Sequence, residues 1–118
     1  MNALYHKDVF LPAGIVELFD GAEFRLDLTF HAKRAAQDDR YGKVTLPSKL
    51  TVKGKEIVEA EVVNGEVTKI VVRTPHDAKR DAVYVLIPNY ERATVKTVWF
   101  NLVSDKHKTL KKDCYSKF

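Results

Sequence analysis

The residues of this chain best suited to chemistry are histidines, arginines and lysines, which together could cleave a phosphodiester without a metal ion. Such a reaction needs a base for the attacking 2′-hydroxyl, cations for the charge that develops on phosphorus, and an acid for the leaving oxygen. The residues that could move these protons or stabilise this charge, and so be catalytic, are His31, Arg73 and His107. The residues that could bind substrate through a cation or an aromatic ring are Arg34, Lys69, Tyr84, Trp99, Lys106 and Lys108.

Each of these residues also has a structural explanation. Aromatic residues in strands, such as Tyr84 and Trp99, fill the cores of small proteins more often than they stack on bases. Arg73 could simply pair with Glu56 across a hairpin, a contact worth about 0.2–1 kcal/mol. Catalysis therefore requires that His31, Arg73 and His107 converge in one cleft.

No motif in the sequence points more strongly to another chemistry. The five glycines are isolated and form no phosphate-binding loop, dinucleotide fingerprint or nucleophile elbow. The four histidines are scattered and Cys114 is the single cysteine, so we expect no metal site, no cofactor and no internal disulfide. The pair Asp38 and Asp39 is interpreted as balancing nearby cations on a solvated helix end.

The excess of positive over negative charge lies entirely in the second half of the chain. Residues 1–59 contain nine Lys/Arg and nine Asp/Glu, whereas residues 60–118 contain eleven and seven, which accounts for the whole net charge of +4. Five of these lysines lie in residues 104–118, a basic tail that follows a strand carrying Trp99 and Asn101. This asymmetry favours RNA or another polyanion as a partner, and the alternative is a solvated tail that keeps the protein soluble.

The size and hydropathy of the chain predict one soluble domain spanning residues 1–118. A chain of 118 residues can bury one core but not two. It contains no apolar run near the roughly 20 residues that cross a bilayer, and its first residues do not follow a signal-peptide pattern. We therefore expect a cytoplasmic protein without a membrane partner, in the host cytoplasm if the chain is phage-encoded.

The predicted fold class is α+β, with one short helix packed on an antiparallel β-meander of about four to six strands. Alternating apolar residues from Glu23 onward predict a strand, which we extend to Phe30, and alanine-rich residues 31–42 predict the helix. The remaining predicted strands are residues 44–46, 57–63, 66–74, 82–87 and 94–103. Residues 1–22 give a mixed signal and are left without a defined structure.

The clearest local signal is Asn64-Gly65 between two β-branched runs, which predicts a tight hairpin. If Val63 pairs with Glu66, an unbroken register places Val62 opposite Val67, Ala60 opposite Lys69, and Glu56 opposite Arg73. Lys69 and Arg73 would then share one face with several valines and form one wall of an anion site.

The order of a helix followed by a four-stranded meander resembles the small metal-independent ribonuclease toxins of the barnase, colicin and RelE type, including BrnT-like relatives. Two segments also resemble small phage and prophage proteins: His31-Ala32, Arg34-Ala35 and Asp39-Arg40-Tyr41-Gly42, then Val95 to Asn101 with Asp105, His107, Thr109 and Leu110. The resemblance spans roughly residues 28 to 110 and implies an RNA-directed or ribosome-directed nuclease. RelE-like toxins begin with a longer helical hairpin than this sequence predicts, so their catalytic set does not transfer by position.

Two main functions follow from these observations, and a third possibility is non-specific nucleic-acid binding, whose affinity should fall steeply with salt. The first is a small basic RNA-directed protein acting as a metal-independent endoribonuclease. The alternative is a non-enzymatic phage-type protein that binds and inhibits a host protein, through an edge strand or through the basic tail. The two differ in whether the candidate catalytic residues lie in one cleft.

Overall fold

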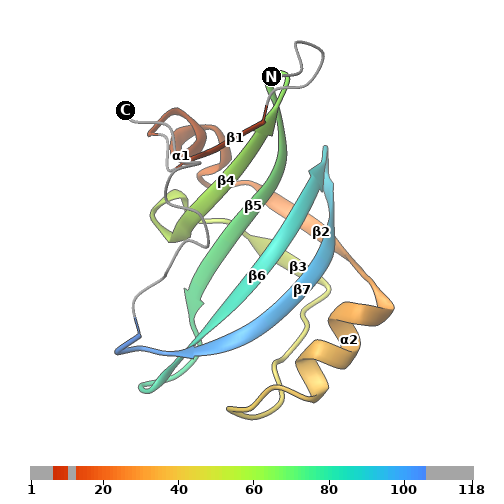
Figure 1. The fold of residues 1–118 in the computed structure, drawn as a ribbon, viewed down its shortest axis with the longest axis vertical. Coiled ribbons are helices and arrows are strands. Elements are labelled where there is room, and N and C mark those ends of the chain that lie inside the picture. The colour runs from red at the N-terminus through yellow and green to blue at the C-terminus, as the bar shows by residue number, and fades with distance from the viewer. Residues whose placement is uncertain (1–6, 11–12, 106–118) are drawn as a thin grey trace.

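A computed structural model describes residues 7–10 and 13–105 of the chain (Figure 1). Along the chain, the helices and strands are β1 (Lys7–Phe10), α1 (Ala13–Phe19), β2 (Glu23–Leu28), α2 (Phe30–Gln37), β3 (Lys49–Thr51), the 3-10 helix η1 (Gly54–Glu56), β4 (Ile57–Val63), β5 (Glu66–Pro75), β6 (Arg80–Asn89) and β7 (Arg92–Leu102). Most of the predicted basic tail, including Lys106, His107 and Lys108, lies outside the described residues.

The strands form one seven-stranded sheet in the order β1-β4-β5-β6-β7-β2-β3. The predicted α+β class is confirmed, and β4 to β7 form the expected meander. The expectation of a purely antiparallel sheet is wrong, because β2 pairs with β7 in parallel. Parallel strands need a long connection, and the chain from α2 to β6 provides it.

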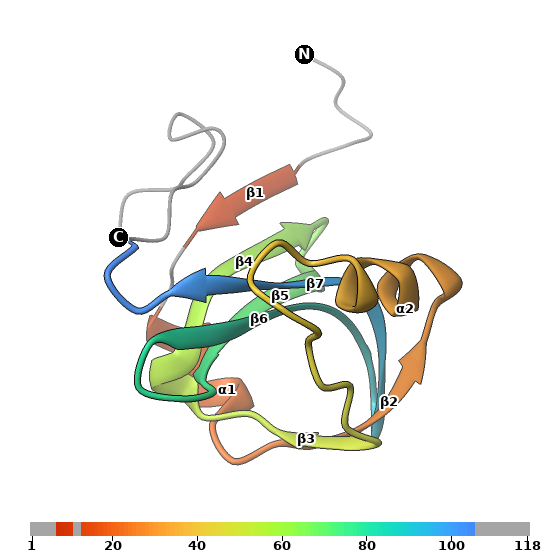
Figure 2. The same ribbon diagram turned by 90° about the horizontal axis from the view of Figure 1, so that it is seen from below.

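The sheet is strongly curled, so that β3 at one end of the strand order lies across from β5 and β6 (Figure 2). Interruptions in the strand register occur in β4 and between β6 and β7, and such bulges bend strands and increase their twist. The main core fills the inside of the curl. Its largest fully buried side chains include Phe100, Ile70 and Leu86.

A smaller apolar cluster lies on the outer face of the sheet. Side chains alternate between faces along a strand, so Val71, Val83 and Val85 point away from the main core and pack together. Val58 and Trp99 border this cluster and are partly buried. Residues 82–86 are therefore buried on both faces, as the unbroken apolar run predicted.

The short helix begins earlier and ends earlier than the sequence predicted. Thr29 caps its first turn by accepting a hydrogen bond from the Ala32 N–H at 3.0 Å, and the Thr29 hydroxyl donates to the Val95 carbonyl at 2.9 Å. At the other end, the helix stops at Gln37, and Asp38 donates its backbone N–H to Arg34. The buried Ala32 and Ala36 let the helix approach the sheet closely.

Two further elements differ from expectation. A second helix, α1, occupies part of the N-terminal region that was left undefined. Residues 44–46 are not a strand, and the short strand before Gly54 is instead β3, which pairs with β2. The longest helix in the described ranges, α2, has eight residues, so no helix there is long and apolar enough to cross a membrane.

The hairpin turn is confirmed, but its register is not continuous. Asn64 and Gly65 have φ angles of 50° and 82°, and Val63 pairs with Glu66 as predicted. Register shifts beyond the turn place Lys69 opposite Glu61 rather than Ala60. The proposed pair of Arg73 with Glu56 is also wrong, because Arg73 forms its ion pair with Asp81 on β6.

Candidate functional site

The structure does not bring the two described catalytic candidates together. His31 is exposed on α2, the helix whose buried alanines join the core on the inner side of the sheet. Arg73 lies on the outer face of β5, opposite Val83 of the outer cluster. Since His31 and Arg73 lie on different sides of the sheet, they cannot act on one phosphate. His107 is outside the described residues.

The side chain of Arg73 on β5 forms hydrogen bonds to β6 and to β7, so it links three strands. Its Nε donates to Asp81 Oδ2 at 2.8 Å, and its Nη2 donates to the Leu102 carbonyl at 2.9 Å. The side chain is 11% exposed. A phosphate would have to displace Asp81 to reach this guanidinium, which favours a structural role.

The other sheet residues predicted to bind substrate also have partners within the protein. Lys69 Nζ lies 3.7 Å from Glu61 Oε2. Tyr84 is 5% exposed and donates its hydroxyl to the Thr45 carbonyl at 3.0 Å, and burial raises the pKa of this phenol. Tyr84 therefore has no face available for a base. Trp99 is partly buried and donates its indole N–H to Asn101 Oδ1 at 3.0 Å.

A different surface carries solvent-facing cations beside an aromatic ring. We call it the outer stripe of α2, made of Phe30, Lys33, Arg34 and Gln37. These residues recur at helical spacing on the side opposite Ala32 and Ala36. Phe30 is 75% exposed, and the guanidinium carbon of Arg34 lies 6.0 Å from the centre of its ring. Arg34 is thus exposed to solvent.

The cations of this region are not neutralised by neighbouring carboxylates. Four of them lie on α2 and in the loop after it, and they form no salt bridge with any residue that the structure describes: Lys33, Arg34, Arg40 and Lys43. Of the two acids in this segment, Asp39 is already used by the backbone, because it accepts hydrogen bonds from the N–H groups of Tyr41 and Phe100. This part of the surface therefore keeps an excess of positive charge.

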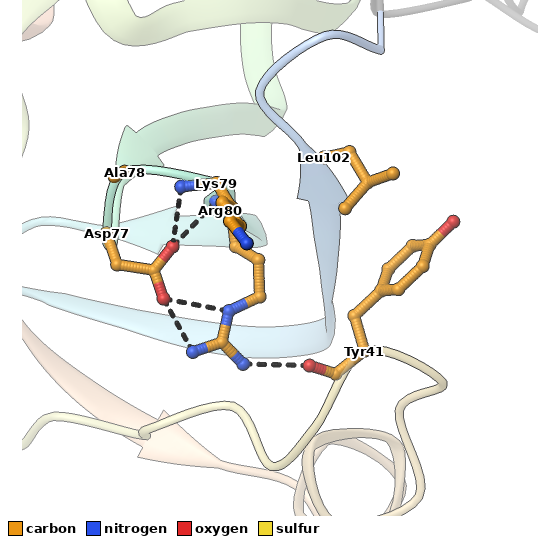
Figure 3. Close-up of a pocket in the computed structure, with 6 residues that line it drawn as sticks. All are labelled: Tyr41, Asp77, Ala78, Lys79, Arg80 and Leu102. Carbon is orange, nitrogen blue, oxygen red and sulfur yellow. Dashed lines mark hydrogen bonds and ion pairs between the residues drawn. The ribbon is translucent and has the colours of Figure 1, made fainter.

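A cavity of about 470 Å³ opens beside the first part of the loop that follows α2 (Figure 3). Its lining residues come from the loop, from the β5–β6 turn and from the end of β7: Tyr41, Asp77, Ala78, Lys79, Arg80 and Leu102. Tyr41 and Leu102 lie on one side, and the polar residues of the turn lie on the other. Leu102 is near the strand-to-tail junction that the charge distribution singled out.

Arg80 is the fixed centre of this cavity wall. Its Nε and Nη2 donate to Asp77 Oδ2 at 2.9 and 2.6 Å, and its Nη1 donates to the Tyr41 carbonyl at 2.8 Å. The guanidinium carbon lies 4.7 Å from the centre of the Phe100 ring. Gly42 permits this arrangement: its φ is +110°, and a Cβ there would lie 2.9 Å from Arg80 Nη1.

Asp77 is neutralised within the same turn. Besides the two guanidinium donors, its Oδ1 accepts the backbone N–H groups of Lys79 and Arg80 at 2.9 and 2.7 Å. The hydrogen bonds from Arg80 and from the Lys79 backbone hold the pKa of Asp77 well below its usual range. The carboxylate is therefore ionised but paired, and it does not leave an uncompensated negative charge in the cavity.

A second cavity of about 480 Å³ lies between α1 and η1. Its walls carry both Glu17 and Asp20 and both Lys53 and Lys55, so they favour neither sign of charge. Among the residues that the structure describes, no group of three His, Cys, Asp or Glu side chains is placed to hold a metal ion. The outer stripe and the neighbouring Tyr41 cavity are thus the surfaces with the clearest chemical preference.

Sequence reasoning missed Phe30 and the Asp77–Arg80 turn. Phe30 was placed inside a strand because it continues the alternation of Phe24, Leu26 and Leu28. The signal that could have found it is Thr29, a good N-cap residue that starts the helix one residue earlier and turns Phe30 outward.

Comparison of the chain with protein-family models, with curated proteins and with solved structures finds no match.

Proposed function

We propose that this protein is RNA-directed and binds single-stranded RNA along the outer stripe of α2. The observation that carries the proposal is Phe30, an aromatic ring 75% exposed on a helix surface, beside Arg34, whose guanidinium forms no salt bridge in the described structure. A single exposed apolar side chain is common on protein surfaces, so the argument rests on the combination of this ring with the cations beside it.

Single-stranded RNA matches this combination of groups. Its unpaired bases stack on aromatic rings, at about 1–3 kcal/mol per base, and its phosphates are attracted by nearby lysine and arginine side chains. Lys33 and Arg34 flank Phe30 on the same side of the helix, and Arg40 and Lys43 follow in the loop. A strand that stacks one base on Phe30 would place adjacent phosphates near these cations.

Binding has more support than cleavage. His31 adjoins the stripe and could exchange a proton, but Arg73 is on the other side of the sheet and already paired. A ribonuclease reaction at this surface would therefore use His31 with Arg34 rather than with Arg73. Incubation with RNA in EDTA tests this narrower possibility, and loss of cleavage in His31→Ala with retained binding would support it.

The proposal is tested by fluorescence anisotropy with a labelled single-stranded RNA of about 12 nucleotides. We expect Phe30→Ala to weaken binding about 5- to 150-fold, the equivalent of one lost stack. The matched control is Tyr90→Ala, which removes another exposed aromatic ring at the β6–β7 turn and should leave affinity unchanged.

Two results would overturn RNA binding at α2. One is the absence of binding to RNA by the wild-type protein at low salt. The other is equal affinity of the wild-type and Phe30→Ala proteins. Either result would leave the host-protein reading from the sequence as the stronger hypothesis.

A further inference from the structure

We infer that the cavity lined by Tyr41, Lys79 and Arg80 is a subsite for a single nucleotide, with the base against Tyr41 and the phosphate near Lys79. This inference rests on the proposed function, because it names where one nucleotide of the bound RNA lies. The cavity volume of about 470 Å³ falls in the range of small-ligand pockets, which is about 300–1,000 Å³.

One side of the cavity is apolar and the other is polar. A nucleotide likewise has a flat base with apolar faces at one end and a charged phosphate at the other. Tyr41 and Leu102 offer an aromatic ring and a branched aliphatic side chain on one side (Figure 3). The facing turn carries the polar side chains of Asp77, Lys79 and Arg80. A bare inorganic anion would not use the apolar side, whereas a base would cover it and leave its phosphate toward the turn.

The charge around the cavity favours a phosphate. The guanidinium of Arg80 and the carboxylate of Asp77 cancel each other through two short hydrogen bonds. Lys79 is exposed, and within the described ranges its ammonium forms no ion pair. Arg40 adds a second cation, with its guanidinium carbon 4.6 Å from the centre of the Tyr41 ring. The carboxylates of Asp39 and Asp105 also lie here, but both accept backbone N–H groups, Asp39 from Tyr41 and Phe100 and Asp105 from Leu102. The exposed cations that remain for a phosphate are Lys79 and Arg40.

The part of the cavity wall around Arg80 is preorganised. Arg80 is held by Asp77, by the Tyr41 carbonyl and by the Phe100 ring. The Val103 N–H donates to the Lys79 carbonyl at 2.8 Å, which ties the end of β7 to the β5–β6 turn. Because these groups are fixed before a ligand arrives, the Lys79 side chain is the main group of the site that binding must order.

The cavity also continues the proposed RNA surface. Arg40 and Tyr41 belong to the loop that leaves the C-terminal end of α2. The Asp39 carboxylate fixes that loop against β7 through the Phe100 N–H. A strand running along the outer stripe toward the end of α2 would thus reach Tyr41 next.

The test is an NMR titration of the full chain with adenosine 5′-monophosphate, with adenosine and inorganic phosphate as separate probes. We expect the amide signals of Ala78, Lys79, Arg80 and Leu102 to shift with the nucleotide, and to shift less with either fragment. Lys79→Gln should weaken nucleotide binding about tenfold, the loss of one charge-assisted contact. Lys53→Gln, which removes an exposed lysine beside η1, is the matched control and should not change it.

Tyr41→Ala should weaken nucleotide binding by a similar factor. Because Tyr41 also packs on the core, that variant could lose affinity through misfolding, and Lys79→Gln is therefore the decisive variant. The inference is overturned if the nucleotide does not shift the cavity signals, or if Lys79→Gln and wild type bind it equally. Those outcomes, with Phe30→Ala still weakening RNA binding, would leave the proposed function standing. If the nucleotide binds at the cavity but RNA does not bind along α2, the nucleotide subsite would be supported and the proposed RNA-binding function would be rejected.

Discussion

The carboxylate of Asp39 accepts a hydrogen bond from the backbone N–H of Phe100 at 3.2 Å, joining the loop after α2 to β7 across 61 residues of sequence. The other carboxylate oxygen accepts the Tyr41 N–H at 3.0 Å. Asp39 therefore sets the path of the loop that carries Arg40 and Tyr41. The interpretation of Asp39 as a solvated charge balancer is wrong, since its two oxygens are used by the backbone.

We predict that Asp39→Ala lowers the free energy of unfolding by about 1–3 kcal/mol, because it leaves the Phe100 N–H without its acceptor. Urea denaturation at neutral pH measures the change. Asp38→Ala is the matched control, since Asp38 is an exposed neighbour with the same side chain, and should change stability by less than about 0.5 kcal/mol. Equal losses in the two variants would contradict the anchoring role.

A second pair of variants tests the close approach of α1 to η1. A Cβ on Gly54 would lie 2.6 Å from the Val16 carbonyl oxygen, and that atom belongs to the backbone and cannot rotate away. We expect Gly54→Ala to destabilise the protein by about 1–3 kcal/mol. Gly14→Ala should instead stabilise it by about 0.4–1 kcal/mol, because a Cβ there meets no atom within 4 Å and the residue is helical. Thermal melts of the two variants should therefore shift in opposite directions.

Local sequence signals predicted those elements whose structure depends on neighbouring residues. The Asn64-Gly65 turn and the doubly buried strand around Tyr84 are examples, since positive φ and a continuous apolar run have few alternatives. The parallel pairing of β2 with β7 could not be predicted in this way. It depends on contacts such as that between Leu28 and Val95, which are distant in the sequence.

The candidate site was harder to predict than the strands. Arg34 is exposed in the structure, whereas Arg73 is paired with Asp81 of β6, a strand outside the hairpin on which its predicted partner was placed. The two register shifts in β4 place Lys69 opposite Glu61 instead of Ala60, but Ile57 and Val72 pair in the predicted register again, so the shifts explain the change at Lys69 and not the pairing of Arg73. Phe30 was missed because its alternation with Leu28 fits the end of a strand, whereas the N-cap at Thr29 makes it the first residue of a helix.

The buried phenol of Tyr84 should make stability depend on alkaline pH. Burial raises its pKa in the folded state, so folding is favoured fully below the unfolded value of about 10 and less as the pH rises above it. Tyr84→Phe should cost about 0.5–1.5 kcal/mol at pH 7 through loss of the hydrogen bond to Thr45. It should also flatten the decline in melting temperature above about pH 10. Tyr90→Phe, which alters an exposed ring, is the control, and an equal flattening in both variants would contradict the assignment.

The salt dependence of RNA binding should identify the cations that contact phosphate. For a single strand, log K decreases with log salt concentration, and the magnitude of this negative slope becomes smaller by about 0.7 for each phosphate contact removed. We therefore expect Arg34→Gln and Lys33→Gln each to lower affinity and to flatten the slope by about 0.7, measured by anisotropy between about 50 and 200 mM salt. Lys49→Gln is the matched control, because Lys49 lies on β3 and its Nζ is 3.9 Å from Glu23 Oε1. An unchanged slope in the two α2 variants would show that the phosphates lie elsewhere on the protein, even if Phe30 stacks a base.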